Sequence, residues 1–402
     1  MNSPDVRRLL WVRGLRAFGD GYVSLLLPIY LLRLGLSPFE VGVITTGTLL
    51  GSGALTLLVG LHAYRFRYRT MLLVATALMA ATGLGFAAVT QFWPLLVVAV
   101  VGTLNPSSGD VSVFLPLEQA VLARIVPDGQ RTAVFARYSL AGALVGAAGA
   151  LSAGLPELLA ATFGWSLQSA TQAMFVLYAL IGVASAAIYR KLPRGLAGET
   201  ETPAAPLRQS RRIVYVLAAL FSLDAFGGGF IVQSMLALWL FEKFQLSTPV
   251  AGTIFFWTGV LSAFSYLVAV RISNRIGLVN TMVFTHLPSN LLLLLMPFVP
   301  NLTWVIALLL ARSALSQMDV PTRSSYVMAV VSPGERAAAA SITSVPRSLA
   351  AATSPLLAGW LLGMSSFGWP LAVAGALKIV YDLLLLATCR TVRPPEEAAR
   401  RR

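Results

Sequence analysis

Charged residues are scarce in this sequence. Asp, Glu, Lys and Arg make up only 11% of its 402 residues, whereas a soluble globular domain carries roughly a quarter. A water-soluble protein of this length could not cover its surface with so few charges. The composition therefore excludes an ordinary soluble fold.

Cysteine and histidine are almost missing. Cys389 is the only cysteine, and His62 and His286 are the only histidines. One chain therefore cannot form a disulfide framework or a cysteine-based metal site, and a histidine-rich metal site is not expected either. An enzyme in the membrane would need a nucleophile–base pair or metal ligands. We therefore expect no catalytic residue, no metal and no cofactor.

Long apolar runs take the place of the missing charges. Hydrophobic residues make up 57% of the chain, and the mean hydropathy is +0.76. Runs of about 20 apolar residues span ~30 Å of hydrocarbon as helices, whose backbone needs no partner from lipid. The sequence predicts an all-α integral membrane protein with twelve helices at 9–33, 39–62, 70–91, 94–124, 132–160, 169–190, 213–241, 249–271, 278–298, 302–331, 337–363 and 368–390.

The basic residues, which give a net charge of +14, collect in alternate loops and in the two tails. The loops between them carry only Lys243, with Arg33 at the edge of the first. Positive residues mark the cytoplasmic side of a membrane protein. We therefore expect both termini in the cytoplasm, an even number of spans, and no nucleic acid partner.

The second half of the chain repeats the first. Residues 36–42 match 246–252 at an offset of 210, and 126–131 match 331–336 at an offset of 205. The only long polar segment of the interior lies between the two copies. We expect two pseudo-symmetric six-helix bundles, 1–190 and 213–402, joined by a cytoplasmic linker at 191–212. Parallel repeats of this kind are a transporter design, with the substrate near the midplane.

The loops after the second and eighth helices carry a motif. In the major facilitator superfamily the first of them typically reads Gly-x-Leu-Ala-Asp-Arg-x-Gly-Arg-Arg. The residues that fit it here and in the second copy are Gly60, Arg65, Arg69, Arg275 and Gly277. The acidic position is Tyr64 in the first copy and Asn274 in the second. With the twelve spans, the cytoplasmic termini and the central loop, the chain resembles this superfamily over essentially its whole length. The resemblance implies that these loops form a cytoplasmic gate, here without the acid of the usual charge relay.

Two further segments, 115–119 and 319–323, are similar to a Pro-x-Arg-Gln stretch found in efflux branches of the superfamily. The Gly-Pro motif of many drug/proton antiporters is absent from the fifth helix. The segments favour export as the direction of transport.

Several ionisable residues fall inside the predicted spans. Each costs roughly 2.5–3.5 kcal/mol on insertion scales, so such residues usually face a cavity and pair. Asp20, Asp110, Asp224 and Asp319 fall near mid-bilayer on helices 1, 4, 7 and 10, which line the cavity in the resembled fold. Glu118 lies in the cytoplasmic half of helix 4. We expect the proton-coupling residues to be Asp20, Glu118, Asp224 and Asp319.

Arg323 has two candidate partners. At the offset of 205 it takes the position of Glu118, which favours a bridge between these two residues across the pseudo-two-fold axis. Alternatively it pairs with Asp319, four residues earlier on the same helix face. An exchange between both partners would couple charge to conformation.

Two other pairs have the spacing of neighbours on one helix face, Arg16 with Asp20 and Lys378 with Asp382. In the first pair, Asp20 is either neutralised locally or takes up a proton. The second pair lies on the peripheral last helix, and we expect it to be structural.

The fourth span contains an unusually polar break, 105–110, which predicts a kinked helix facing protein or water. Glycines 227–229 follow Asp224 and soften the seventh span. The residues that we expect to line the substrate cavity are Arg16, Asn105, Asp110, Arg323, Gln233 and Phe230.

These patterns predict a secondary transporter that moves a small organic solute by alternating access, with proton-coupled efflux as the first hypothesis. Uptake of an anionic or zwitterionic metabolite by proton symport is the alternative, and the mixture of Arg with Asp and Glu favours such a substrate. A receptor without transport activity is a third hypothesis. We expect a monomer in the cell inner (cytoplasmic) membrane, with a small-molecule substrate, protons and the lipid bilayer as its partners.

Overall fold

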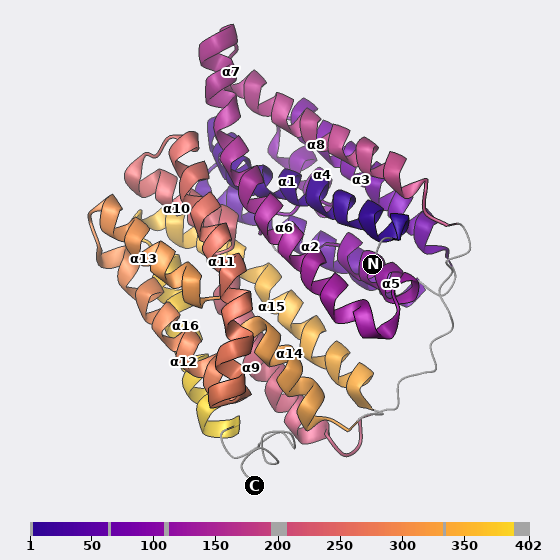
Figure 1. The fold of residues 1–402 in the computed structure, drawn as a ribbon. Helices are drawn as coiled ribbons and strands as arrows, with labels where there is room; N and C mark the ends of the chain where they lie inside the picture. Colours follow the sequence, from indigo (N-terminus) through magenta and orange to yellow (C-terminus); the bar gives the residue numbers. More distant parts are fainter. Residues whose placement is uncertain (1–2, 63–65, 108–111, 194–206, 333–334, 390–402) are drawn as a thin grey trace. The chain divides into compact units, whose positions relative to one another are not determined.

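The computed structural model describes residues 3–62, 66–107, 112–193, 207–332 and 335–389 (Figure 1). Within these ranges the chain is almost entirely helical and contains no β-strand. This confirms the predicted all-α membrane fold. Nine helical segments of the described part are long and apolar enough to cross a bilayer.

The helices form two units, and each is described here by itself. The first unit contains 1–200 and 232–257. Its elements are α1 (Pro4–Arg33), α2 (Pro38–His62), α3 (Tyr68–Ala88), α4 (Phe92–Val101), α5 (Phe114–Ile125), α6 (Asp128–Leu151), η1 (Ser152–Gly154), α7 (Leu155–Phe163), α8 (Leu167–Tyr189), α10 (Gln233–Phe244) and the start of α11 (Thr248–Ile276).

The second unit contains 201–231 and 258–402. Its elements are α9 (Arg211–Gly229), the rest of α11, α12 (Leu278–Leu295), η2 (Met296–Phe298), α13 (Leu302–Leu315), α14 (Asp319–Val330), α15 (Arg336–Met364) and α16 (Trp369–Cys389). The expected division into 1–190 and 213–402 stays a prediction, because α10 and the start of α11 belong to the first unit by their contacts.

Three of the expected spans are interrupted, among them 213–241, which divides into α9 and α10. The expected helix 94–124 ends at Val101 and resumes at Phe114, and the expected helix 302–331 divides into α13 and α14. Local chemistry explains the interruption after Val101. Pro106 has no N–H to donate, and the Asn105 side chain accepts hydrogen bonds from the N–H and hydroxyl of Ser107, at 3.1 and 2.7 Å. The prediction of one continuous, kinked helix was wrong here, although the polar break lies where the sequence placed it.

In the first unit, α1 packs against α6 and α8, and α3 packs against α8. Glycine allows the closest approach. A Cβ on Gly21 of α1 would lie 2.1 Å from the carbonyl oxygen of Gly146 on α6, and one on Gly149 would lie 2.2 Å from that of Phe18. Small residues of this kind let helix backbones come together in lipid, where packing replaces the hydrophobic effect.

In the second unit, α9 packs against α15 and α16, and α12 packs against α16. Phe221, Met282, Tyr326 and Tyr381 belong to its apolar core. Gly277, which joins α11 to α12, has φ +89°, a conformation that favours glycine. The glycine of the motif is therefore explained by the backbone turn that it makes.

One carboxylate holds the start of α9. Glu335 accepts hydrogen bonds from the backbone N–H groups of Arg208, Gln209 and Ser210, at 2.6, 2.9 and 3.0 Å. These bonds, the one from Arg208 first, lower the pKa of Glu335 from 4.5 to about 2. The loop before α15 is thereby tied to the chain that leads into α9.

The Gly21 contact predicts a selective loss of stability. Gly21→Ala places a methyl group against backbone that cannot move aside, so we expect unfolding to become easier by about 1–3 kcal/mol. Gly53→Ala in α2 is the matched control, because its Cβ would meet nothing within 4 Å. Thermal unfolding in detergent measures both variants. Equal effects of the two substitutions would contradict the proposed close packing of α1 and α6.

The Glu335 contact predicts a pH-dependent protection of residues 208–210. Because the folded-state pKa lies below the ordinary value, the contact stabilises the protein above about pH 4.5 and is lost as the pH falls toward about 2. Glu335→Gln should accelerate amide hydrogen exchange at these three residues already at neutral pH. Glu242→Gln in α10 is the control. Unchanged exchange in Glu335→Gln would show that the carboxylate does not hold this segment.

Candidate functional site

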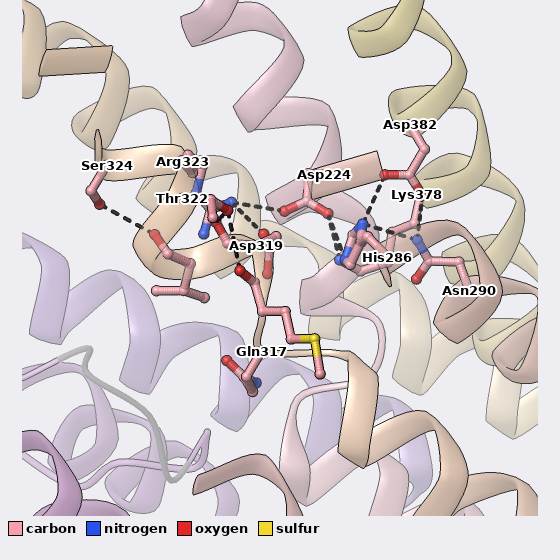
Figure 2. A network of polar contacts seen from close by, with 12 residues as sticks. Asp224, His286, Asn290, Gln317, Asp319, Thr322, Arg323, Ser324, Lys378 and Asp382 are labelled. Carbon is pink, nitrogen blue, oxygen red and sulfur yellow. Dashed lines mark hydrogen bonds and ion pairs between the residues drawn. The ribbon is translucent and has the colours of Figure 1, made fainter. Parts of the chain in front are cut away.

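Ionisable side chains from three helices of the second unit converge on Asp224 (Figure 2). Asp224 lies on α9 and is buried. The Lys378 Nζ atom lies 2.5 Å from its Oδ1, and the Arg323 Nη1 atom lies 3.1 Å from its Oδ2. The His286 Nε2 atom lies 3.8 Å from Oδ1. One carboxylate thus has two cations and a histidine as neighbours.

His286 continues the network to a second carboxylate. Its Nδ1 atom lies 2.9 Å from Oδ1 of Asp382 on α16. The side-chain amide of Asn290, one turn after His286 on α12, donates to Oδ2 of Asp382 at 2.8 Å. His286 therefore lies between two buried aspartates, one on each side of its ring (Figure 2).

Arg323 links a third aspartate to the network. Its Nη1 atom lies 3.4 Å from Oδ2 of Asp319, four residues earlier on α14. The centre of its guanidinium lies 5.5 Å from the centre of the Phe221 ring, within the ~6 Å typical of cation–π contacts. The Asp319 partner that the sequence offered for Arg323 is therefore present. Arg323 bridges Asp319 and Asp224 within one unit.

The network brings opposite charges together inside the protein. A buried carboxylate needs such compensation, and Lys378 and Arg323 supply it for Asp224. Which ring nitrogen of His286 carries the hydrogen depends on its tautomer. In the described part of the chain no three His, Cys, Asp or Glu side chains are placed to hold a metal ion.

The first unit has its own buried carboxylate. Glu118 on α5 is fully buried and lies 2.5 Å from the Arg16 Nη2 atom of α1. The hydroxyls of Tyr138 and Tyr189 also donate to it, from α6 and α8. The Arg16 guanidinium stacks 4.1 Å from the centre of the Phe114 ring. Four helices thus contribute to the surroundings of one acid.

Asp20 has other neighbours besides Arg16. Among the described residues the ion pair of Arg16 is with Glu118, while Asp20 stays within electrostatic reach of Arg16, so its local neutralisation by Arg16 stays a prediction. Asp20 is also hydrogen-bonded by the Asn105 side chain and lies 3.5 Å from the Tyr178 hydroxyl. That hydroxyl is also 3.2 Å from the carbonyl oxygen of Thr103, in the interruption after α4.

The predicted Lys378–Asp382 pair was wrong. Lys378 binds Asp224, and Asp382 binds His286 and Asn290. Both residues belong to the Asp224 network and are not a separate structural pair. For these two residues, partners on facing helices take the place of the neighbour four residues away on the same helix.

The remaining predicted residues are distributed over both units. Phe230 is buried directly after α9, and Gln233 is half-buried at the start of α10. Asp110 and Arg65 lie outside the described residues.

Of the predicted gate, Gly60 lies in the last turn of α2, Arg69 is half-buried in the first turn of α3, and Arg275 is exposed near the end of α11. The Glu118–Arg323 bridge stays a prediction, since each residue has the partners described above within its own unit.

Several residues of the networks were missed by the sequence analysis. They are His286, Asn290, Tyr138, Tyr178 and Tyr189. His286 and Asn290 carried a usable signal, because two polar residues four apart inside an apolar span share one helix face. The tyrosines carried none, since tyrosine in a span is equally common at interfaces and in packing.

The chain matches a known family over nearly its whole length. The sequence profile of the Major Facilitator Superfamily matches residues 9–233 and 217–402. The uncharacterized membrane protein YJR124C of Saccharomyces cerevisiae is 24% identical over 419 residues, which cover 95% of this chain and 93% of that protein.

Solved structures share the fold at low identity. A bacterial homologue of the human lysosomal transporter Spinster, inward-facing and occupied, has a TM-score of 0.76 at 14% identity and 96% coverage of both chains. The nucleoside transporter NupG has a TM-score of 0.74 at 12% identity, covering 96% of this chain and 99% of its own. The human organic anion transporter MFSD10 has a TM-score of 0.64 at 17% identity, covering 96% and 100%.

The Asp224 network predicts a strong energetic coupling. Asp224→Asn leaves Lys378 and Arg323 buried beside a neutral group, so we expect a loss of about 3–5 kcal/mol in unfolding free energy. Adding Lys378→Met to Asp224→Asn should restore part of the lost unfolding free energy, because it removes one uncompensated cation. Thermal unfolding of both single variants and the double variant measures the coupling. A double variant that is no more stable than Asp224→Asn would show that the two residues are not coupled.

Proposed function

The chain belongs to the Major Facilitator Superfamily, and from this premise we propose that it is a proton-coupled secondary transporter exporting a small organic solute. It would work in the cell inner (cytoplasmic) membrane by alternating access of two repeated six-helix bundles. The repeats at offsets of 210 and 205 support the two bundles. The resemblance of 115–119 and 319–323 to efflux branches supports export.

The observation that carries the proposal is the surroundings of Asp224. Buried ion pairs contribute little to stability, and apolar residues of similar volume often replace them without loss. A network of three aspartates, an arginine, a lysine and a histidine is therefore poorly explained as a packing device. Its members are ionisable groups, which would exchange ion-pair partners when one of them binds a proton.

Charged or titratable groups on five other helices lie within electrostatic reach of Asp224. They are Lys378, Tyr381 and Asp382 on α16, His286 on α12, Arg323 on α14, Arg312 on α13 and Arg347 on α15. Asp319 of α14 joins them through Arg323. A proton on Asp224 would weaken its hold on Lys378 and Arg323 together. Since those cations come from α16 and α14, protonation would loosen two helices from α9.

Glu118 offers a second proton-binding site in the first unit. Arg16, Tyr138 and Tyr189 all donate to it, so its ionised form is well satisfied. Protonation would release Arg16 from α5 and leave that cation for a substrate or for another acid. Asp20, one turn further along α1, is the nearest carboxylate on the same helix.

Export and uptake differ in whether the proton and the solute bind to the protein in turn or together. Export requires that they bind in turn, whereas uptake by symport requires that they bind together. By their names, NupG transports nucleosides and MFSD10 transports organic anions. Their substrates are not carried over to this chain, whose identity to them is low.

Transport in proteoliposomes tests the proposal. With an imposed pH gradient and a panel of labelled metabolites, we expect gradient-driven movement by the unaltered protein. Asp20→Asn, Glu118→Gln and Asp224→Asn should retain solute exchange without a gradient but lose most of the acceleration by the gradient. Glu242→Gln is the control and should behave like the unaltered protein. If all three Asp and Glu variants kept their pH dependence, these residues would not carry the proton.

A further inference from the structure

An apolar groove lies between α1 and α6 of the first unit, with a volume of about 430 Å³. Side chains of α1 form one wall, and Ala141 and Val145 of α6 form the other. Gly14 of α1 leaves room between the walls, since a Cβ there would lie 3.8 Å from a Val145 methyl group. Trp11, which lines the groove on α1, is 69% exposed. No part of the chain that the structure describes therefore covers the groove at this turn.

The groove faces away from the buried charges of the first unit. Arg16 reaches from α1 to Glu118 of α5. Trp11 and Phe18, which line the groove, lie about 140–160° from Arg16 around the helix axis, at ~3.6 residues per turn. The groove is therefore separate from the residues that we propose to bind protons. On a membrane-spanning helix such an apolar face is suited to contact with lipid, whose tails are as apolar as leucine.

Two arginines lie at the same end of the groove. Arg7 lines it on α1, and Arg137 lies one turn before Ala141 on the same face of α6. The two helices run in the same direction, as their successive glycine contacts show. Arg7 lies seven residues before Gly14, and Arg137 lies eight residues before Val145, the neighbour of Gly14. Both arginines thus lie at a similar level along the paired helices.

Neither Arg7 nor Arg137 has an ion-pair partner within the described ranges of the chain. Asp5 is close to Arg7 in sequence but binds Arg8, whose Nη1 atom lies 2.6 Å from its Oδ1. Both unpaired arginines are exposed. Trp11 follows Arg7 by one turn, and tryptophan in a spanning helix favours the level of the lipid headgroups. Two cations without a carboxylate therefore lie where the phosphates of a bilayer are expected.

The length of the groove matches one leaflet of a bilayer. From Arg7 to Phe18 it follows α1 for about 16 Å, at ~1.5 Å per residue. The hydrocarbon core is ~30 Å thick, so the groove extends from the headgroup level to about the midplane. An acyl chain of one lipid covers this depth. A second copy of the chain fits less well, because a two-fold interface would bring the arginines of one copy against those of the other.

We propose that this groove binds one anionic phospholipid, with its phosphate at Arg7 and Arg137 and one acyl chain along Leu15, Phe18 and Val145. The planar fork of arginine matches phosphate oxygens through paired N–H donors. Any phospholipid can place a chain in the groove, so selectivity among lipids rests on headgroup charge. A zwitterionic headgroup brings its own cation to the two arginines, whereas an anionic headgroup does not. The site does not depend on the proposed direction or coupling of transport.

Purified full chain in detergent tests the proposal with two lipids that share their acyl chains. These are dioleoylphosphatidylglycerol, which is anionic, and dioleoylphosphatidylcholine, which is zwitterionic. We expect phosphatidylglycerol to raise the unfolding temperature saturably and to remain bound at one molecule per chain in native mass spectrometry. Phosphatidylcholine should bind more weakly, and inorganic phosphate alone should have no effect. This comparison uses the unaltered protein and does not depend on the folding of any variant.

Variants at the two ends of the groove complete the test. Arg7→Gln and Arg137→Gln should each weaken the apparent affinity for phosphatidylglycerol by about fivefold, the effect of one basic residue near an anionic headgroup. Arg271→Gln, an exposed arginine of α11, is their matched control. Ala141→Leu should weaken the binding of both lipids, because it fills the groove. Leu144→Phe enlarges an exposed side chain of α6 outside the groove and should leave binding unchanged.

Three results would overturn the inference. The first is equal stabilisation of the unaltered protein by both lipids, which would indicate contact with bulk lipid only. The second is a preference for phosphatidylglycerol that both arginine variants retain in full, or stabilisation by inorganic phosphate alone. The third is a dimer in detergent whose stability lipid does not change, which would assign the groove to a second copy of this chain.

Discussion

A charge that is buried among helices in lipid must find its partner inside the protein, and the second unit is arranged around this constraint at Asp224. The carboxylate lies 2.5 Å from the Lys378 Nζ atom and 3.1 Å from the Arg323 Nη1 atom. Because these partners come from α16 and α14, one side chain of α9 holds two other helices. His286 of α12 then connects the same carboxylate to Asp382 of α16.

The same constraint applies to the backbone where helices are interrupted. Backbone that leaves a helix inside a membrane protein must find partners in other parts of the protein. After α4, the Thr103 carbonyl oxygen has the Tyr178 hydroxyl, and the Pro106 carbonyl oxygen accepts from the N–H of Ser234 at the start of α10. The interruption therefore gives α8 and α10 fixed points of attachment within the first unit.

Much of the fold and part of the site could be predicted from the sequence. Hydropathy and the placement of arginines are periodic signals along one chain, so they predicted the membrane helices and the family resemblance. Asp224 and Glu118 were predicted because an acid inside a span is costly wherever it points. Their partners could not be predicted, because pairing depends on which helix faces which. For that reason Lys378 and Asp382 were assigned to each other, and His286 was overlooked.

The two networks have opposite polarity. In the first unit the cation, Arg16, lies on α1, the first helix of the repeat, and the acid, Glu118, lies on α5. In the second unit the acid, Asp224, lies on α9, the first helix of the repeat, and the cation, Arg323, lies on α14. Glu118 and Arg323 are equivalent positions at the offset of 205. If the halves arose by duplication, Glu118 and Arg323 descend from one residue, and a reversal of its charge in one half required a partner of the opposite sign in that half. Arg16 and Asp224 supply these partners from positions that neither offset makes equivalent, so each bridge would have been acquired separately.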